Sequence, residues 1–93
     1  GGEMLTKPFT FTGRALELNF ATSAAGSIGV ELQDASGKPI PGFALADSLP
    51  TIGNELDRVV EWKGGSDVSR LAGQSVRLRL VLKDADVFSL RFR

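Results

Sequence analysis

Two aspartates separated by one residue, Asp84 and Asp86, are the first residues to consider for chemistry. Two carboxylates can hydrolyse a glycosidic bond when they face each other across a cleft. A chain of 93 residues has little room for such a cleft. An Asp-Ala-Asp sequence is typical of a turn, in which the carboxylates accept hydrogen bonds from nearby backbone N–H groups. The pair therefore favours a turn over a catalytic centre.

The sequence contains no histidine and no cysteine. Cysteine nucleophiles, histidine-based triads and Cys/His metal sites are therefore excluded. Gly64-Gly65 lacks the Lys-Ser/Thr pair of a phosphate-binding loop. We expect a non-enzymatic protein without a cofactor or metal. A calcium site that uses Asp84, Asp86 or Glu3 stays open as a lesser alternative.

Charge is balanced in total but not along the chain. Residues 1–62 hold four basic and eight acidic groups, a net charge of −4, whereas residues 63–93 hold seven basic and three acidic groups, a net charge of +4. A neutral chain argues against nucleic-acid or membrane-surface binding. We expect Arg77, Arg79 and Arg91 to pair across strands with Glu17 or Glu31. A basic strip that meets an anionic partner is the alternative.

The elements that position these residues follow a period of two. Apolar and polar residues alternate over 14–20, 27–33, 76–83 and 87–93. This pattern predicts four antiparallel strands, each with one face in the core and one in water. Turn sequences at 12–14, 23–26, 34–38 and 83–86 separate them.

Two further strands are predicted from weaker patterns. Glu3–Thr12 contains Pro8 and is expected at a sheet edge, because proline cannot donate to a ladder. Leu56–Trp62 would place Leu56, Val60 and Trp62 on one face, although Arg58 then falls on the apolar side. A single helical turn is expected over Val68–Leu71, capped by Ser66 or Asp67.

These elements predict one all-β domain over residues 1–93, an antiparallel, jelly-roll-like β-sandwich of about six to eight short strands with at most one helical turn. No apolar run reaches the length of a membrane helix. Gly1-Gly2-Glu3 has no basic head or apolar stretch of a signal peptide. We expect that the domain was excised from a larger protein.

The C-terminal third also resembles a known family. Similar segments occur in the terminal β-sandwich of bacterial secreted proteins that carry a glycoside-hydrolase-like β-propeller of the family 32/43 type. The matching segments are Trp62–Asp67, Leu71–Gly73, Arg77–Arg79 and Asp84–Ser89, and the opening from Leu5 to Phe43 is similar. Gly29 and Ser48-Leu49-Pro50 depart from the pattern. The resemblance implies a non-catalytic accessory domain, extracellular or periplasmic, attached to a parent catalytic domain.

Carbohydrate is the ligand class that this resemblance suggests, as a polysaccharide or oligosaccharide. Aromatic faces stack on sugar rings, while carboxylates and cationic groups hydrogen-bond to hydroxyls. The candidate ligand-binding residues are Trp62, Asp57, Arg58, Asp47 and Lys63. Trp62 shares its parity with Val60, however, which favours a place in the core.

A purely structural domain is the alternative function. Such a domain would pack on its catalytic partner domain, or self-associate as a homo-oligomer through an exposed edge strand. Glu3–Thr12 is the candidate edge, because Phe9 and Phe11 are able to point outward there.

Overall fold

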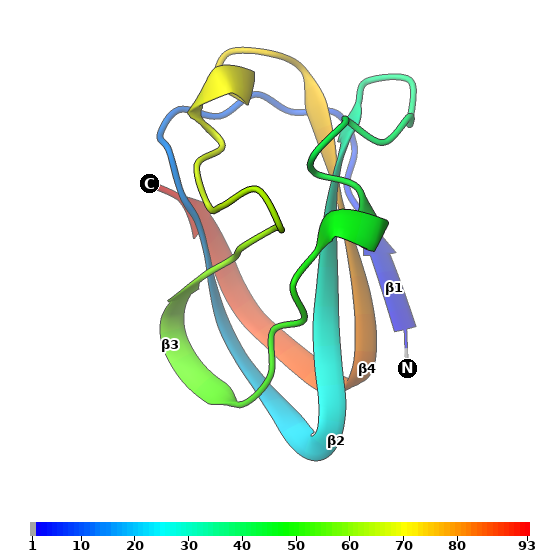
Figure 1. Cartoon of the computed structure of the whole chain (residues 1–93), viewed down its shortest axis with the longest axis vertical. Coiled ribbons are helices and arrows are strands. Elements are labelled where there is room, and N and C mark those ends of the chain that lie inside the picture. Colours follow the sequence, from blue (N-terminus) through cyan, green and yellow to red (C-terminus); the bar gives the residue numbers. More distant parts are fainter. Residues whose placement is uncertain (1) are drawn as a thin grey trace.

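The computed structural model describes residues 2–93 and contains a single four-stranded antiparallel sheet in the order β1-β4-β2-β3 (Figure 1). Its elements are β1 (Gly2–Leu5), β2 (Leu16–Asp34), the 3-10 turn η1 (Leu45–Asp47), β3 (Asn54–Val59), the 3-10 turn η2 (Ser69–Leu71) and β4 (Val76–Phe92). The antiparallel β class is thus confirmed. The described residues form four strands in one sheet, fewer than the six to eight that we expected.

The difference in strand number arises because the four predicted alternating segments merge in pairs. Segments 14–20 and 27–33 become the continuous strand β2, and segments 76–83 and 87–93 become β4. The two long strands stay paired on both sides of an irregularity between Thr22 and Ser27. Figure 1 shows both strands turning back at the same end of the molecule. The predicted turns at 23–26 and 83–86 are therefore bends at which the strands continue.

A close backbone contact accompanies this bend. A Cβ atom on Gly26 would overlap the carbonyl oxygens of Asp84 and Lys83. Asp84 itself adopts a left-handed backbone conformation with a φ of 44°. Only a residue without a side chain fits against these carbonyls, so Gly26 allows β2 and β4 to bend together.

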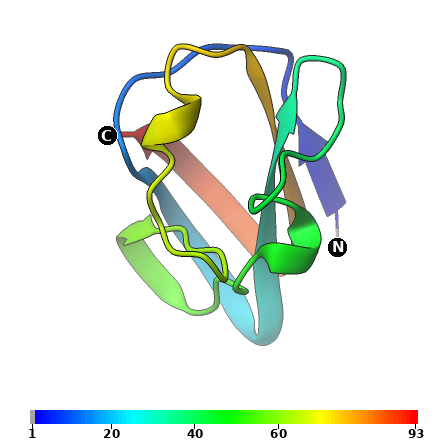
Figure 2. The ribbon, with the colours of Figure 1, turned by 45° about the horizontal axis from the view of Figure 1, so that its top comes forward.

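The concave side of the bent sheet holds the core. The two long strands contribute the alternating apolar residues that the sequence predicted, and the chain between β2 and β4 closes over them (Figure 2). The buried residues from the strands are Leu16, Leu18, Phe20, Ile28, Val30, Leu32, Val76, Leu78 and Leu80. The connecting segment adds Phe43, Val60, Trp62, Val68 and Leu71. Loops and 3-10 turns thus supply much of the layer opposite the sheet.

Strand β3 differs from the predicted strand in its residue range and in which side chains point toward the core. It ends at Val59, before the buried residues Val60 and Trp62, and Leu56 is 80% exposed where we expected it in the core. Asp57 has a φ of 54°, and the pairing of β2 with β3 is irregular between Leu18 and Phe20. This left-handed residue breaks the alternation and turns Leu56 outward.

The N-terminal segment is shorter as a strand than predicted, and its aromatic rings lie inside. Strand β1 forms one sheet edge and ends before Pro8. Phe11 is buried and stacks on Phe92 with ring centroids 4.0 Å apart, and Phe9 lies 5.7 Å from the same ring. The expectation that Phe9 and Phe11 point outward was wrong, because both complete the core at the end of β4.

The helical turn near residue 70 is present as predicted. The turn η2 covers Ser69–Leu71, and the carboxylate of Asp67 accepts a 2.8 Å hydrogen bond from the Ser69 N–H. Gly73 follows with a φ of 81°.

Substituting Gly26 tests the bend. We expect Gly26→Ala to lower the free energy of unfolding by about 1–3 kcal/mol, because the new methyl group overlaps two carbonyl oxygens. Gly64→Ala is the matched control, since a Cβ there meets nothing within 4 Å. Urea titration followed by tryptophan fluorescence measures both. Equal stabilities of the two variants would contradict the role of Gly26.

Candidate functional site

The five predicted ligand-binding residues separate into a buried ring and two surface pairs. Trp62 is 1% exposed, and its indole Nε1 donates a 2.9 Å hydrogen bond to the Val30 carbonyl oxygen. Its ring also makes an edge contact with Phe43 at 5.1 Å. The indole ring thus packs inside the protein, and its N–H is already hydrogen-bonded there. Trp62 is therefore a core residue, as its shared parity with Val60 favoured, and its ring faces the interior of the protein.

The other four residues lie in two different places. The backbone N–H of Lys63 donates to the Asp47 carbonyl oxygen at 2.8 Å, which joins η1 to the segment after Trp62. Asp57 and Arg58 lie on β3, where Arg58 forms an ion pair of 2.9 Å with Glu55. The Asp57 N–H is bound by the Asn19 side chain at 2.6 Å. The structure thus joins Asp47 and Lys63 through their backbones, whereas the side chain of Arg58 pairs with Glu55 and that of Asp57 lies 3.9 Å from Arg91. It does not bring the five residues into one site.

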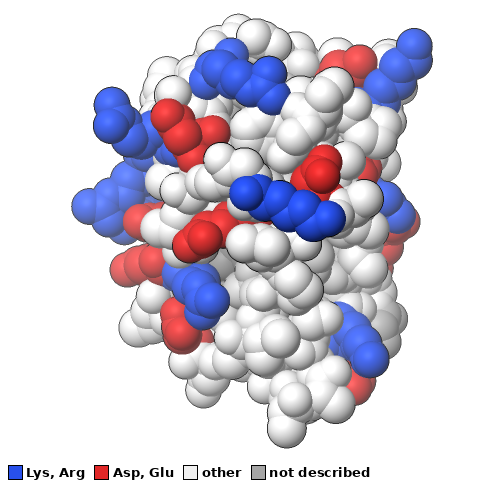
Figure 3. All heavy atoms as spheres, viewed as in Figure 1, with Lys and Arg blue, Asp and Glu red and all other residues white. Residues whose placement is uncertain are grey.

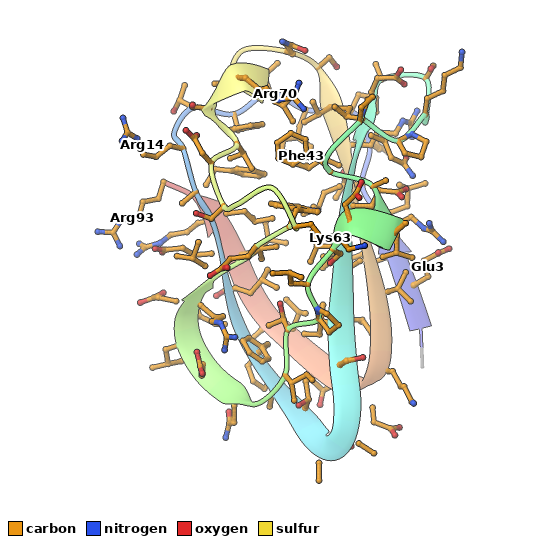
Figure 4. All side chains as sticks on the ribbon, in the orientation of Figure 1. Glu3, Arg14, Phe43, Lys63, Arg70 and Arg93 are labelled. Atoms are coloured by element: carbon orange, nitrogen blue, oxygen red, sulfur yellow. The ribbon has the colours of Figure 1, made fainter. Side chains whose placement is uncertain are left out.

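A more convergent group surrounds Phe43. A surface hollow there is lined by Gly42, Phe43, Gly64, Gly65, Asp67 and Arg70. The Arg70 guanidinium carbon lies 4.9 Å from the centre of the Phe43 ring, and Nη2 donates to the Pro41 carbonyl oxygen at 2.6 Å. In Figure 4 the Phe43 ring lies beneath Arg70, with Lys63 on the side of η1. Three elements therefore contribute to the hollow, namely the loop after β2, the Gly64-Gly65 turn and η2.

Hydrogen bonds keep the Asp67 carboxylate in the hollow ionised. The hydroxyl and backbone N–H of Ser69 donate to Asp67 and hold the pKa of this carboxyl below its usual range. The carboxylate is thus ionised at neutral pH, and it lines the same hollow as the cation of Arg70. Sequence reasoning proposed Asp67 only as a helix cap and did not single out Arg70. The position of Arg70 in the sequence, a few residues after Gly64-Gly65, does not indicate that η2 packs next to Phe43.

Two buried glutamates organise the remaining charges, and both confirm the expected cross-strand pairing. Glu17 is 6% exposed and accepts from Arg91 Nε at 2.9 Å and from Arg93 Nη1 at 3.3 Å. The pKa of Glu17 is lowered, chiefly by the hydrogen bond from Arg91. Arg79 lies 3.5 Å from Glu31. Arg77 does not pair and instead donates to the Ala35 carbonyl oxygen.

Glu31 also fastens the loop that carries η1. Its carboxylate accepts 2.8 Å hydrogen bonds from the Leu45 N–H and from Gln33 Nε2. Burial raises the pKa of Glu31, but these hydrogen bonds and the charge of Arg79 outweigh burial and lower it overall. Glu31 therefore acts as an ionised anchor for the loop.

The basic groups are dispersed on the visible face of the molecule. Figure 3 shows Lys and Arg atoms interspersed with Asp and Glu atoms over this face. Arg14 and Arg93 project to one side (Figure 4) and line a second hollow together with Glu17 and Ser69. On this face the mixed charges favour cross-strand pairing of Arg with Glu over a continuous basic strip.

Residues 2–93 contain neither a metal-binding cluster nor a membrane-spanning helix. This part of the chain holds no cluster of three or more acidic side chains that would bind a metal ion. None of its helices has the length and apolar character required to cross a bilayer.

Comparison with known proteins gives no relative. No family model, no curated protein and no solved structure matches the chain.

Replacing Trp62 tests its assignment to the core. We expect Trp62→Ala to lower the free energy of unfolding by about 3–5 kcal/mol, because it empties a fully buried site and leaves the Val30 carbonyl unpaired. Differential scanning calorimetry provides the measurement. Leu56→Ala, at an exposed position, is the control and should change stability by less than about 0.5 kcal/mol. A stable Trp62→Ala variant would contradict the assignment.

The Glu31 anchor predicts a pH dependence. A pKa lowered in the folded state stabilises the protein above the unfolded value of 4.5, and this stabilisation is lost as the pH falls through the folded value. We expect Glu31→Gln to be less stable than the parent at pH 7, by about 1–2 kcal/mol. The difference should shrink below pH 4.5.

Chemical denaturation between about pH 3 and pH 7 measures this difference in stability. Glu61→Gln makes the same change at an exposed glutamate and is the matched control for the loss of one carboxylate. A difference between Glu31→Gln and the parent that is constant over this range would contradict the ionised anchor.

Proposed function

We propose that this chain is a non-catalytic accessory module that binds carbohydrate weakly at the Phe43 hollow. The observation that carries the proposal is the meeting of an aromatic ring, a guanidinium and an ionised carboxylate in one hollow. Guanidinium and carboxylate groups hydrogen-bond to sugar hydroxyls, and Phe43, which is itself only 7% exposed, supports Arg70 from beneath.

The free donors of Arg70 support the same assignment. A guanidinium has five N–H donors, and within residues 2–93 the Pro41 carbonyl is the one acceptor that Arg70 contacts. The guanidinium carbon lies over the Phe43 ring at 4.9 Å, a contact that helps to hold the group in place. Gly64 and Gly65 leave the rim open, since a Cβ at either position would meet nothing within 4 Å. A polyhydroxylated ligand can thus approach donors that are already oriented.

The larger context follows from the resemblance of Trp62–Asp67 and Asp84–Ser89 to the terminal domains described above. We propose that the chain belongs to an extracellular or periplasmic bacterial protein with a glycoside-hydrolase-like parent domain. The two arms of the bent sheet would then correspond to the two layers of a jelly-roll sandwich. Lys63 directly precedes Gly64 of the hollow and is joined to Asp47 by a backbone hydrogen bond, whereas Asp57 and Arg58 belong to β3.

Affinity electrophoresis tests the proposal. We expect xylan, arabinan, inulin or levan in the gel to retard the chain, and Arg70→Ala to abolish this retardation. Arg58→Ala, which removes an arginine outside the hollow, is the matched control and should be retarded like the parent. Thermal melts should show that both variants stay folded, within about 1 kcal/mol of the parent.

Two results would contradict the proposal. Retention of binding by Arg70→Ala would reject the Phe43 hollow as the site. Absence of retardation by all four polysaccharides would reject carbohydrate binding and favour the structural alternative, in which the module packs on its catalytic partner domain.

A further inference from the structure

The second half of β4 is an open edge of the sheet. Strand β1 pairs with β4 only from Arg79 to Leu82, and β2 is the only strand that pairs with β4 from Ala85 to Phe92 within residues 2–93. The opposite edge of β2 is covered along both halves: β3 pairs with Glu17–Ala21, and the Ser48 hydroxyl and the Phe43 carbonyl accept the N–H groups of Val30 and Leu32. The segment 84–93 therefore presents unpaired backbone groups along one side.

The side chains along this edge also indicate a missing neighbour. Val87, Leu90 and Phe92 pack against the core but are only partly buried. Phe88, at the centre of the segment, is 68% exposed. Between Val87 and Leu90 there is no charge and no proline, the devices that normally protect an edge strand.

The charges of the segment are complementary to themselves. Asp84 and Asp86 lie at its beginning, and Arg91 and Arg93 at its end. If two copies pair antiparallel about a point between Phe88 and Ser89, Asp86 of each copy lies opposite Arg91 of the other. The same register sets Asp84 opposite Arg93. Each charged pair occurs twice, as in an isologous interface with two-fold symmetry.

An irregularity in β4 makes this register possible. Directly opposed residues of a sheet must lie on the same face, and Asp86 and Arg91 would lie on opposite faces of a regular strand. Asn19 of β2 pairs with Ser89 and the next residue, Phe20, pairs with Val87. Phe88 is therefore an extra residue on β4 that has no partner on β2. Asp86 pairs with Ala21 and Arg91 with Glu17, which share the face away from the core.

The same shift aligns the apolar side chains. Val87 pairs with Phe20 and Leu90 with Leu18, both of which are buried in the core. In the register centred between Phe88 and Ser89, Val87 of one copy lies opposite Leu90 of the other. Charges and apolar residues thus match on both faces.

From this we infer that the chain forms a symmetric homodimer by antiparallel pairing of residues 84–93 of β4, which joins two sheets into one. This edge differs from Glu3–Thr12, which we expected from the sequence, because Phe9 and Phe11 lie against the core. The dimer places no requirement on the Phe43 hollow, so its failure would leave the proposed carbohydrate site untouched.

Sedimentation equilibrium of the 93-residue chain from about 10 µM to about 1 mM tests the inference. We expect a concentration-dependent dimer, and a dissociation constant raised about tenfold or more in Asp86→Lys, because two attractive pairs become repulsive. Glu61→Lys makes the same change of charge at an exposed position away from this edge and should dimerise like the parent. A monomer at all concentrations, or equal effects of both variants, would overturn the inference.

Cysteine cross-linking supplies a second measurement that does not depend on charge. The chain has no native cysteine, so Phe88→Cys introduces a single thiol at the centre of the proposed interface. We expect it to form a disulfide-linked dimer faster than Leu56→Cys, the control at an apolar position on β3 that is even more exposed, at 80% against 68% for Phe88. Equal or slower cross-linking of Phe88→Cys would overturn the proposed register.

Discussion

The fold depends on how closely two backbones approach at one bend. Gly26 of β2 lies against the carbonyl oxygens of Lys83 and Asp84, so that both strands change direction together and stay paired. Without this contact the two halves of the sheet could not enclose a common interior. Because β2 and β4 supply most of the buried aliphatic residues, the core exists only when the sheet is bent.

Buried carboxylates connect this sheet to the segments around it. Glu31 lies on β2 but accepts the Leu45 N–H, and it thereby holds the η1 loop next to the strand. Glu17 lies on the other half of β2 and accepts from Arg91 and Arg93 near the end of β4. The acidic first part of the sequence and its basic last part are thus paired within one sheet.

The sequence pattern predicted the strands well because their side chains alternate between core and solvent. Leu16, Leu18 and Phe20 lie inside as expected, as do Leu78 and Leu80. Periodicity could not show whether a strand ends or bends at Gly26, since small residues favour both. It also could not foresee Asp57, whose left-handed conformation exposes Leu56. The Phe43 hollow escaped prediction because Arg70 reaches it through tertiary packing from a separate turn.

The order of the strands has a consequence for how the chain acquires its structure during synthesis. Strand β4 lies between β1 and β2, and the hydrogen bond from Arg79 to Glu3 spans 76 positions. Contacts of such high sequence separation slow folding, because a long loop must close before any of them forms. On the ribosome, β1 and β2 emerge before their shared neighbour has been made. These early strands must therefore wait with exposed apolar faces, a state in which a chaperone would protect them from aggregation.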